Sequence, residues 1–280
     1  MLSYRHAYHA GNQGDVLKHW VLVLCLEYLK RKDKPFFYMD THAGAGQYSL
    51  MDAYARKTAE SDSGIARIWN DAKAPAVLSD YLTLVSSFNK VKPPKLHSYP
   101  GSPVVAAALM RSDDRLRLIE MHSSDRAKLE QHFCRDRRVK VMDGDGFQLL
   151  KGLLPPVTRR GIVLVDPSYE MKTDYQRVPG CLKESLNRFA SGTYLVWYPL
   201  INSLPAQRYS DQLKKLPCDN WLDVQLRVNS PPQGHGMYGS GMFVINPPWT
   251  LKADLEQGLP YLTEKLGDDE TAEWAIQHNQ

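Results

Sequence analysis

The stretch Phe36-Phe-Tyr-Met-Asp40-Thr-His-Ala-Gly44-Ala-Gly46 decides the fold, because an apolar segment runs directly into a turn that contains two glycines. Residues 36–41 predict a short buried strand. Glycines in the turn after a first strand let the backbone approach a bound cofactor without a Cβ clash. The pattern is shorter than G-x-G-x-x-G, and a plain strand-to-helix turn also explains it. Asp40 ahead of the glycines is more typical of S-adenosylmethionine sites than of NAD sites.

Strands and helices alternate on both sides of this turn. Residues 13–31 repeat apolar side chains near a 3.6 period, which predicts a helix before the first strand. Further strands are predicted at 116–121, 139–143, 161–166 and 193–198, with helices at 124–134, 147–154 and 174–189. This alternation predicts an α/β fold with a mostly parallel sheet. Residues 221–228 and 242–246 are strands with no helix between them, which predicts a C-terminal antiparallel hairpin.

Residues 49–97 interrupt the alternation. They contain helical patterns at 65–72 and 76–89 and no convincing strand. In nucleotide-binding sheets an acid about 20 residues after the glycines binds ribose hydroxyls. Glu120 lies 74 residues after Gly46, and removing 49 inserted residues leaves 25. We therefore expect one α/β domain of residues 1–48 and 98–280, with 49–97 as an inserted helical subdomain.

The charge of the chain is uneven. The 280 residues include 35 Lys and Arg against 31 Asp and Glu, a net charge of +4. Residues 252–280 hold seven acidic and two basic side chains, so residues 1–251 carry +9. A basic body of this size suggests a polyanionic partner.

Composition also bears on compartment and on metal binding. No apolar run approaches the ~20 residues of a membrane span, and the N-terminus lacks the apolar region of a signal peptide. The four cysteines form no C-x-x-C pair. We therefore expect a cytoplasmic protein with reduced thiols. His6 and His9 lack a third well-spaced ligand, so no metal site is expected.

Two stretches resemble the [DNS]-P-P-[YFW] motif of amino-methyltransferases, in which two oxygens accept the hydrogens of an exocyclic amine and an aromatic ring stacks on its base. They are Asp166-Pro-Ser-Tyr169 and Asn246-Pro-Pro-Trp249. The second matches better letter by letter. The first ends a strand predicted to be parallel, at the edge where α/β sheets bind ligands. We therefore assign catalysis to Asp166, Pro167 and Tyr169.

Two more motifs lie where such a site would contact a cofactor. Ser102 stands in Pro100-Gly-Ser-Pro103, and its alternative role is to cap the helix that follows. The stretch Asp143-Gly-Asp145-Gly146 follows the third strand, and its alternative is a plain Asp-Gly turn.

Over nearly its whole length the sequence resembles the bacterial 23S ribosomal RNA adenine-N6 methyltransferases of the J type. The stretches that carry the resemblance are Met1-Leu-Ser-Tyr-Arg-His6, Ala10-Gly-Asn12, Asp15-Val-Leu-Lys-His19, Asp40-Thr-His-Ala-Gly-Ala-Gly46, Tyr99-Pro-Gly-Ser-Pro103 and Pro155-Pro156 with Arg159-Arg-Gly161. The resemblance implies a Rossmann-like methyltransferase fold. It implies S-adenosylmethionine as methyl donor, S-adenosylhomocysteine as product and an adenine of 23S rRNA as acceptor. We expect a monomer.

The same resemblance assigns roles to residues of this chain. It implies cofactor binding by His19, His42, Gly44, Gly46, Ser102, Glu120, Asp145 and Gly146, catalysis by Asp166, and a role toward RNA for Tyr4, His6 and Lys18. Basic residues in three clusters are expected to contact phosphates, with a merely solvated surface as the alternative: Lys30, Arg31, Lys32, Lys34, Arg135, Arg137, Arg138, Arg159 and Arg160.

One departure from the family keeps other functions open. Ser168 stands where the family has a second proline, which would restrict the conformation of Pro167. A catalytically impaired RNA-binding or ribosome-assembly protein is therefore an alternative. An NAD(P)-dependent oxidoreductase is a further alternative, disfavoured by the incomplete glycine pattern.

Overall fold

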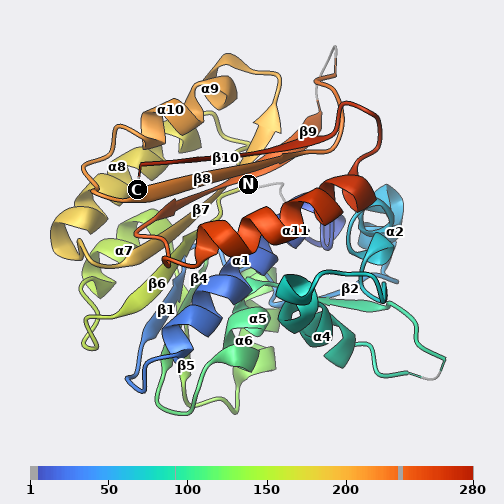
Figure 1. Ribbon diagram of the computed structural model, residues 1–280. Helices are drawn as coiled ribbons and strands as arrows, with labels where there is room; N and C mark the ends of the chain where they lie inside the picture. Colours follow the sequence, from blue (N-terminus) through green and yellow to red (C-terminus); the bar gives the residue numbers. More distant parts are fainter. Residues whose placement is uncertain (1–5, 92, 233–235, 280) are drawn as a thin grey trace.

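An eight-stranded sheet forms the centre of the protein (Figure 1). The structure, a computed structural model, describes residues 6–91, 93–232 and 236–279. Strand β1 (Phe37–Asp40) pairs in parallel with β4 (Arg115–Glu120) on one side and with β6 (Gly161–Val165) on the other. The parallel part continues to β5 (Val139–Asp143) beyond β4 and to β7 (Thr193–Ile201) beyond β6. The predicted α/β fold is thereby confirmed.

The C-terminal strands run antiparallel to this core. Strand β9 (Met237–Ile245) lies between β7 and β8 (Trp221–Arg227) and is antiparallel to both, which confirms the predicted hairpin. Strand β10 (Glu273–His278) adds an outer edge to β8 and was not predicted. Its side chains are exposed or half-buried and lack the apolar alternation by which a strand is recognised in a sequence.

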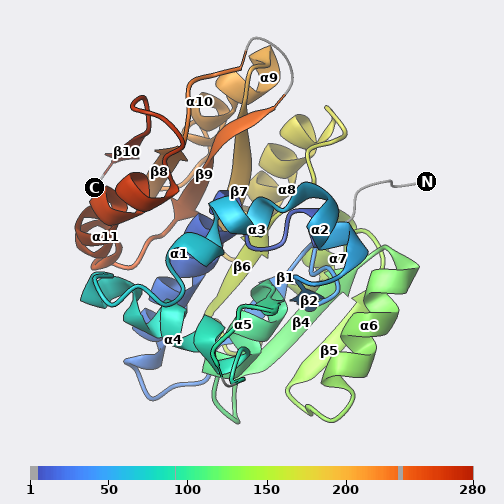
Figure 2. The same ribbon diagram turned by 90° about the vertical axis from the view of Figure 1, so that its right-hand side faces the viewer.

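Helices cover both faces of the sheet (Figures 1 and 2). One face carries α1 (Gln13–Lys30), α5 (Ser102–Leu109), α6 (Ser123–Phe133) and α11 (Leu251–Leu266). The other carries α7 (Gly146–Leu153), α8 (Asp174–Arg188), α9 (Leu204–Gln207) and α10 (Tyr209–Leu213). Within the described ranges, no helix is long and apolar enough to cross a membrane.

Helix α1 is buried along most of its length. It begins after Asn12, whose side chain accepts a hydrogen bond of 2.9 Å from the backbone N–H of Asp15. It packs against strands β7 and β9 and against four helices, so apolar side chains surround it. Its first two turns nevertheless bury three ionisable side chains, Asp15, Lys18 and His19. Charged groups are rarely buried without a partner, so we expect partners for these side chains near the start of the helix.

A second, two-stranded sheet joins the ends of the segment 49–97. Its strands are β2 (Gln47–Ser49) and β3 (Ser98–Pro100), which pair antiparallel. Between them lie α2 (Ala53–Thr58), α3 (Glu60–Ser63), α4 (Ser79–Ser87) and two short 3-10 turns, η2 (Ile65–Arg67) and η3 (Ala76–Leu78). Ile65, Tyr81 and Val85 belong to the same apolar cluster as α1. The division into 1–48 with 98–280 and 49–97 stays a prediction.

Gly146 fixes how closely α7 approaches β1. A Cβ at this position would lie 2.1 Å from the backbone oxygen of Thr41, and a backbone atom cannot move aside cheaply. We expect Gly146→Ala to lower the free energy of unfolding by about 1–3 kcal/mol, the usual cost of overpacking. Urea denaturation measures it.

The control for this substitution lies on the same helix. A Cβ at Gly152 would meet nothing within 4 Å. Gly152→Ala should therefore leave stability unchanged or raise it by up to about 1 kcal/mol. Equal losses in the two variants would contradict the close approach of α7 to Thr41.

Candidate active site

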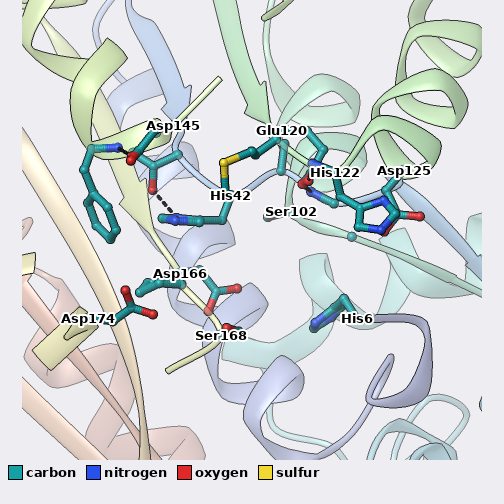
Figure 3. A pocket seen from close by; sticks show the side chains of 18 of the residues that line it. His6, His42, Ser102, Glu120, His122, Asp125, Asp145, Asp166, Ser168 and Asp174 are labelled. Atoms are coloured by element: carbon teal, nitrogen blue, oxygen red, sulfur yellow. Dashed lines mark hydrogen bonds between the residues drawn. The ribbon is translucent and has the colours of Figure 1, made fainter. Parts of the chain in front are cut away.

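A pocket opens at the carboxyl ends of β1, β4, β5 and β6 (Figure 3). It encloses about 1050 Å³, including the open space at its mouth. Its walls come from the loops after these strands and from α1: Thr41, His42, Gly44, Glu120, His122, Gly144, Asp145, Gly146, Asp166, Pro167, Lys18 and His19. Because parallel strands end together at one edge, residues far apart in the sequence meet here.

Most of the predicted site residues line this pocket. They are His6, Lys18, His19, His42, Gly44, Ser102, Glu120, Asp145, Gly146, Asp166 and Pro167. Gly46 lies outside its lining, with a left-handed φ of 84°, and shapes the turn instead. Tyr169 lines a neighbouring pocket. Tyr4 lies outside the described residues.

Glu120 is held at the tip of β4 by the glycine turn. Its two carboxylate oxygens accept hydrogen bonds from the backbone N–H of Gly44, at 2.7 Å, and of His122, at 2.6 Å. Burial raises the pKa of Glu120 above its ordinary value, although these hydrogen bonds oppose the shift. These two hydrogen bonds fix the orientation of the Glu120 carboxylate at the pocket, and the first of them connects it to the glycine turn.

Ser102 does not cap helix α5. The helix has Gly101 at its N-cap and Ser102 as its first residue, and no side chain caps it. The Ser102 hydroxyl instead donates a hydrogen bond of 2.7 Å to Asp40, which also accepts one of 2.8 Å from Tyr38. Asp40 is fully buried, and burial raises its pKa. The alternative role of Ser102, as the cap of α5, is therefore excluded, because its hydroxyl binds Asp40.

Asp145 caps helix α7 at the opposite wall. Its side chain accepts a hydrogen bond of 2.9 Å from the backbone N–H of Phe147 and forms an ion pair with Arg177. The Arg177 guanidinium lies 4.4 Å from the centre of the Phe147 ring. The Asp-Gly pair therefore starts a helix, and Phe147 lies in the pocket wall beside it.

A chain of buried ionic contacts joins α1 to the end of β6. Lys18 Nζ lies 2.8 Å from a carboxylate oxygen of Asp15 and 2.5 Å from one of Asp166. His6 Nε2 lies 2.9 Å from Asp15. Burial alone would lower the pKa of Lys18, but Asp15 and Asp166 outweigh it and raise the pKa. Burial would likewise raise the pKa of Asp15, and the cationic neighbours hold it well below its ordinary value. Lys18 therefore stays charged at neutral pH.

His19 presents an unpartnered ring nitrogen at the pocket. Its Nδ1 lies 2.8 Å from the hydroxyl of Tyr99, while its buried Nε2 has no protein partner. Buried polar atoms without partners are uncommon in folded proteins, so this nitrogen is available to a molecule bound in the pocket. Burial lowers the pKa of His19 to about 3 and that of His42 to about 4, so both imidazoles are neutral at pH 7.

A second pocket adjoins the first at Asp166. It shares the side chains of His6, Lys18, Asp166 and Ser168 with the first pocket. Tyr169 and Trp197 supply its aromatic walls. The Tyr169 hydroxyl donates a hydrogen bond of 2.8 Å to the Trp197 carbonyl and lies 3.1 Å from the hydroxyl of Tyr209. Asp166 thus stands between two cavities, one of them lined by aromatic rings.

The competing motif lies elsewhere. Asn246 follows β9, which is antiparallel to β7, so it lies at the amino edge of the parallel strands. Its side chain donates hydrogen bonds of 2.7 Å to the carbonyls of Ala190 and Gly192. Asn246–Trp249 lines neither pocket. Among the described residues, no group of three or more His, Cys, Asp or Glu side chains is placed to hold a metal ion.

Sequence comparison places the chain among known proteins. Residues 33–278 match the model of the family described as Ribosomal RNA large subunit methyltransferase D, RlmJ. The chain belongs to this family. The Ribosomal RNA large subunit methyltransferase J of Escherichia coli (strain K12) is 48% identical over 266 residues, which cover 95% of this chain and 94% of that protein. The protein of the same name from Haemophilus influenzae is 44% identical over 277 residues, 99% of this chain and 98% of the relative.

A solved structure is similar to this methyltransferase family member over its length. The crystal structure of a Legionella pneumophila protein superposes with a TM-score of 0.89 at 34% identity, covering 97% of this chain and 99% of that one. The resemblance seen in the sequence is therefore confirmed at the level of the family.

Three residues of the candidate site are not predicted from the sequence. Trp197 lies inside strand β7, where an aromatic side chain is ordinarily interpreted as part of the hydrophobic core. Arg177 lies in the first turns of α8 and reads as a surface charge. Asp15 lies on an apolar helix, and only its burial reveals its part in the ion-pair chain. Trp197 and Arg177 stand in no motif. Asp15 stands in the stretch Asp15-Val-Leu-Lys-His19, which carries the family resemblance, but no role was assigned to it there.

Buried neutral His19 makes the stability of this family member depend on pH. Its folded pKa of about 3 lies below the 6.5 of an unfolded histidine, so the unfolded state binds more protons as pH falls below 6.5. Lowering pH from 7 to 5 should therefore cost about 2 kcal/mol of unfolding free energy through His19. We expect His19→Gln to reduce the measured loss by about that amount in denaturation at the two pH values.

An exposed histidine provides the control for this measurement. His278 lies on the outer strand β10. His278→Gln makes the same side-chain change at this exposed position and is measured in parallel at both pH values. An equal loss in His19→Gln and the wild type would show that His19 is not buried in its neutral form.

Proposed function

We propose that this family member transfers a methyl group from S-adenosylmethionine to the N6 amine of an adenine in 23S ribosomal RNA. The observation that carries the proposal is the position of Asp166 between two pockets, because methyl transfer requires donor and acceptor on either side of one catalytic group. The names of the Escherichia coli and Haemophilus influenzae relatives support ribosomal RNA of the large subunit as the substrate. We expect the enzyme to act in the cytoplasm, as a monomer.

The charge of the first pocket fits S-adenosylmethionine. Its lining holds five carboxylates, Glu120, Asp125, Asp145, Asp166 and Asp174, against the cations Lys18 and Arg177. An acidic pocket favours a ligand with sulfonium and ammonium charges and disfavours the pyrophosphate of NAD(P), which argues against the oxidoreductase alternative. The unpartnered Nε2 of His19 offers a further polar contact. When bound, this cofactor supplies the activated methyl group.

Residues of this chain would hold the ribose and the base of the cofactor in the way that is usual for nucleotide-binding α/β sheets. We assign Glu120 to the ribose hydroxyls because it stands at the tip of β4, next to the glycine turn. We assign Asp145, Gly146 and Phe147 to the base, because they form the start of α7 at the same edge of the sheet. His19, His42, Gly44 and Ser102 complete the wall, and Gly46 shapes the turn.

The second pocket suits a flipped or single-stranded adenine. Adenine would enter against the rings of Tyr169 and Trp197, and its N6 hydrogens would bond Asp166 and the Pro167 carbonyl. Lys18 fixes the orientation of Asp166, and Asp15 fixes Lys18. We assign His6 and Lys18 to the acceptor side because both line this pocket. Tyr4 is assigned to the RNA on the resemblance alone.

Ser168, which replaces the second proline of the family motif, is compatible with binding of the adenine amine by Asp166 and the Pro167 carbonyl. Pro167 is buried, and the turn after it is anchored by the Tyr169 hydroxyl on Trp197 and Tyr209. Tyr169 itself adopts a left-handed φ of 54°, which is rare without glycine and recurs at functional turns. The anchored turn supports an active enzyme over the catalytically impaired RNA-binding alternative.

Removing Asp166 tests the proposed activity. We expect Asp166→Ala to slow transfer of a radiolabelled methyl group to protein-free 23S rRNA by about 10²–10⁴, the usual effect of losing a positioned proton acceptor. Calorimetry should show that S-adenosylhomocysteine still binds.

The control uses the rejected motif. Trp249 is 74% exposed and lines neither pocket, so Trp249→Ala should keep the wild-type rate. If Trp249→Ala lost activity and Asp166→Ala kept it, catalysis would belong to the Asn246–Trp249 motif and not to the Asp166–Tyr169 motif. Absence of any label transfer by the wild type would reject the methyltransferase assignment.

Trp197 tests the acceptor pocket separately. Base–aromatic stacking contributes about 1–3 kcal/mol per base, so Trp197→Leu should raise the KM for rRNA by roughly 5- to 150-fold. Its effect on S-adenosylhomocysteine affinity should be small, because Trp197 lines only the second pocket. An unchanged KM for RNA would remove Trp197 from the acceptor site.

A further inference from the structure

A cluster of basic side chains lies at the edge of the sheet opposite the pockets. Four segments enter β1, β4, β5 and β6: residues 30–34, 111–115, 135–138 and 159–160. We call them the amino-edge ridge. The loops that lead into β1, β4 and β5 lie at the bottom of the molecule in Figures 1 and 2. Together the four segments hold eleven basic and four acidic residues, a net charge of +7.

Backbone hydrogen bonds make the ridge continuous. The N–H of Phe37 bonds the Arg160 carbonyl at 2.9 Å, the N–H of Arg115 bonds the Phe36 carbonyl at 3.3 Å, and the N–H of Leu116 bonds the Arg138 carbonyl at 3.0 Å. The guanidinium groups of Arg111 and Arg160 both donate to the Lys34 carbonyl, at 2.7 Å. With neighbouring strands about 4.8 Å apart, the ridge crosses about 14 Å of surface.

Much of this positive charge faces solvent. Lys32, Lys34, Arg135 and Arg137 are exposed, and within the described chain none of the four has a carboxylate partner. Two of the four acids of the ridge are used internally, since Asp114 binds the N–H of Phe36 and Asp136 binds Arg138. The other two, Asp33 and Asp113, are exposed, so the ridge is a solvent-facing surface with a net positive charge.

The two pockets have the opposite charge. Counting histidines as neutral, the lining of the first pocket carries −3, and that of the second carries −3 from Asp15, Glu60, Asp166 and Glu170 against Lys18. Such linings repel phosphates. Nearly all of the affinity of proteins for nucleic-acid backbones is electrostatic, so a polyanionic substrate needs a cationic surface elsewhere. The ridge holds most of the +9 of residues 1–251.

We propose that the amino-edge ridge binds the phosphate backbone of a second segment of the substrate RNA, remote from the adenine in the acceptor pocket. Strand β6 separates the two sites by five residues, or roughly 17 Å. Nucleotides next to the target base lie at the acidic pockets, and the ridge meets a part of the folded RNA that wraps around the sheet edge. The proposal rests on RNA as substrate and extends it to a two-point contact.

A charge-removal variant tests the ridge. The quadruple variant Lys32→Ala, Lys34→Ala, Arg135→Ala, Arg137→Ala changes only exposed side chains that lie outside both pockets. Its control, Lys73→Ala, Lys183→Ala, Arg208→Ala, Lys215→Ala, removes the same charge from exposed positions scattered over other parts of the surface. Circular dichroism verifies folding of both. The probes are a full-length 23S rRNA transcript and a fragment of about five nucleotides around the adenine that the wild type labels in it, too short to span the distance to the ridge.

The expected results separate the ridge from the active site. For the transcript, the slope of log Kd against log salt should fall by about three in the ridge variant, and Kd and KM should rise at least about tenfold, with kcat unchanged. The control should keep the wild-type slope. With the short fragment, the ridge variant should match the wild type, because the fragment cannot reach the ridge.

Three outcomes would overturn the two-point contact. They are an unchanged slope in the ridge variant, equal slope changes in ridge and control variants, and an equal loss of affinity for the transcript and the fragment. Failure of the wild type to label any RNA would instead reject the proposed methyltransferase function. The salt slopes of transcript binding would then still decide whether the ridge binds RNA.

Discussion

The contact of Lys18 with two carboxylates holds the candidate site together. Asp15 comes from the same helix as Lys18, one turn earlier, whereas Asp166 ends strand β6, 148 residues further along the chain. Removing three charges from water is unfavourable, and burial is tolerated only because each charge has a partner at hydrogen-bond distance. Loss of Lys18 would leave two neighbouring carboxylates without the cation that they share. The first turns of α1 and the end of β6 are therefore fixed relative to each other, and with them the boundary between the two pockets.

The position of that ionic contact follows from sheet topology. Strands β5, β4, β1 and β6 run parallel, so the loops after them share one edge, and each contributes one wall of the first pocket. Helix α1 precedes β1 and lies across the face of the sheet, which brings its buried N-terminal turns to the same edge. The aromatic wall of the second pocket comes from β7, the next parallel strand.

Sequence patterns were sufficient to predict a site residue where its role depends on its position along a strand. The turn Asp40–Gly46, Glu120 at the tip of β4 and Asp166 at the end of β6 were placed at one edge by counting strands, and Asn246 was placed at the other. Patterns were insufficient where the role depends on a partner from another element. Ser102 looked like a helix cap because Pro103 follows it, but its hydroxyl turns toward Asp40, 62 residues away. Trp197 is ordinary in the sequence, and its role is visible only because it lines the second pocket together with Asp166. Asp15 belongs to a stretch that resembles the family, but its role is visible only from its contact with Lys18.

The same topology explains how the charged residues are distributed over the two edges of the sheet. Residues that precede parallel strands lie at the amino edge and residues that follow them lie at the carboxyl edge. In this chain the former are rich in Lys and Arg and the latter in Asp and Glu, so a modest net charge of +4 conceals a molecule with two oppositely charged ends. A cationic cofactor and a polyanionic substrate favour opposite potentials. Placing them at opposite edges of one sheet lets each be attracted without weakening the other, while the adenine, which is uncharged, is the part of the RNA that enters the acidic edge.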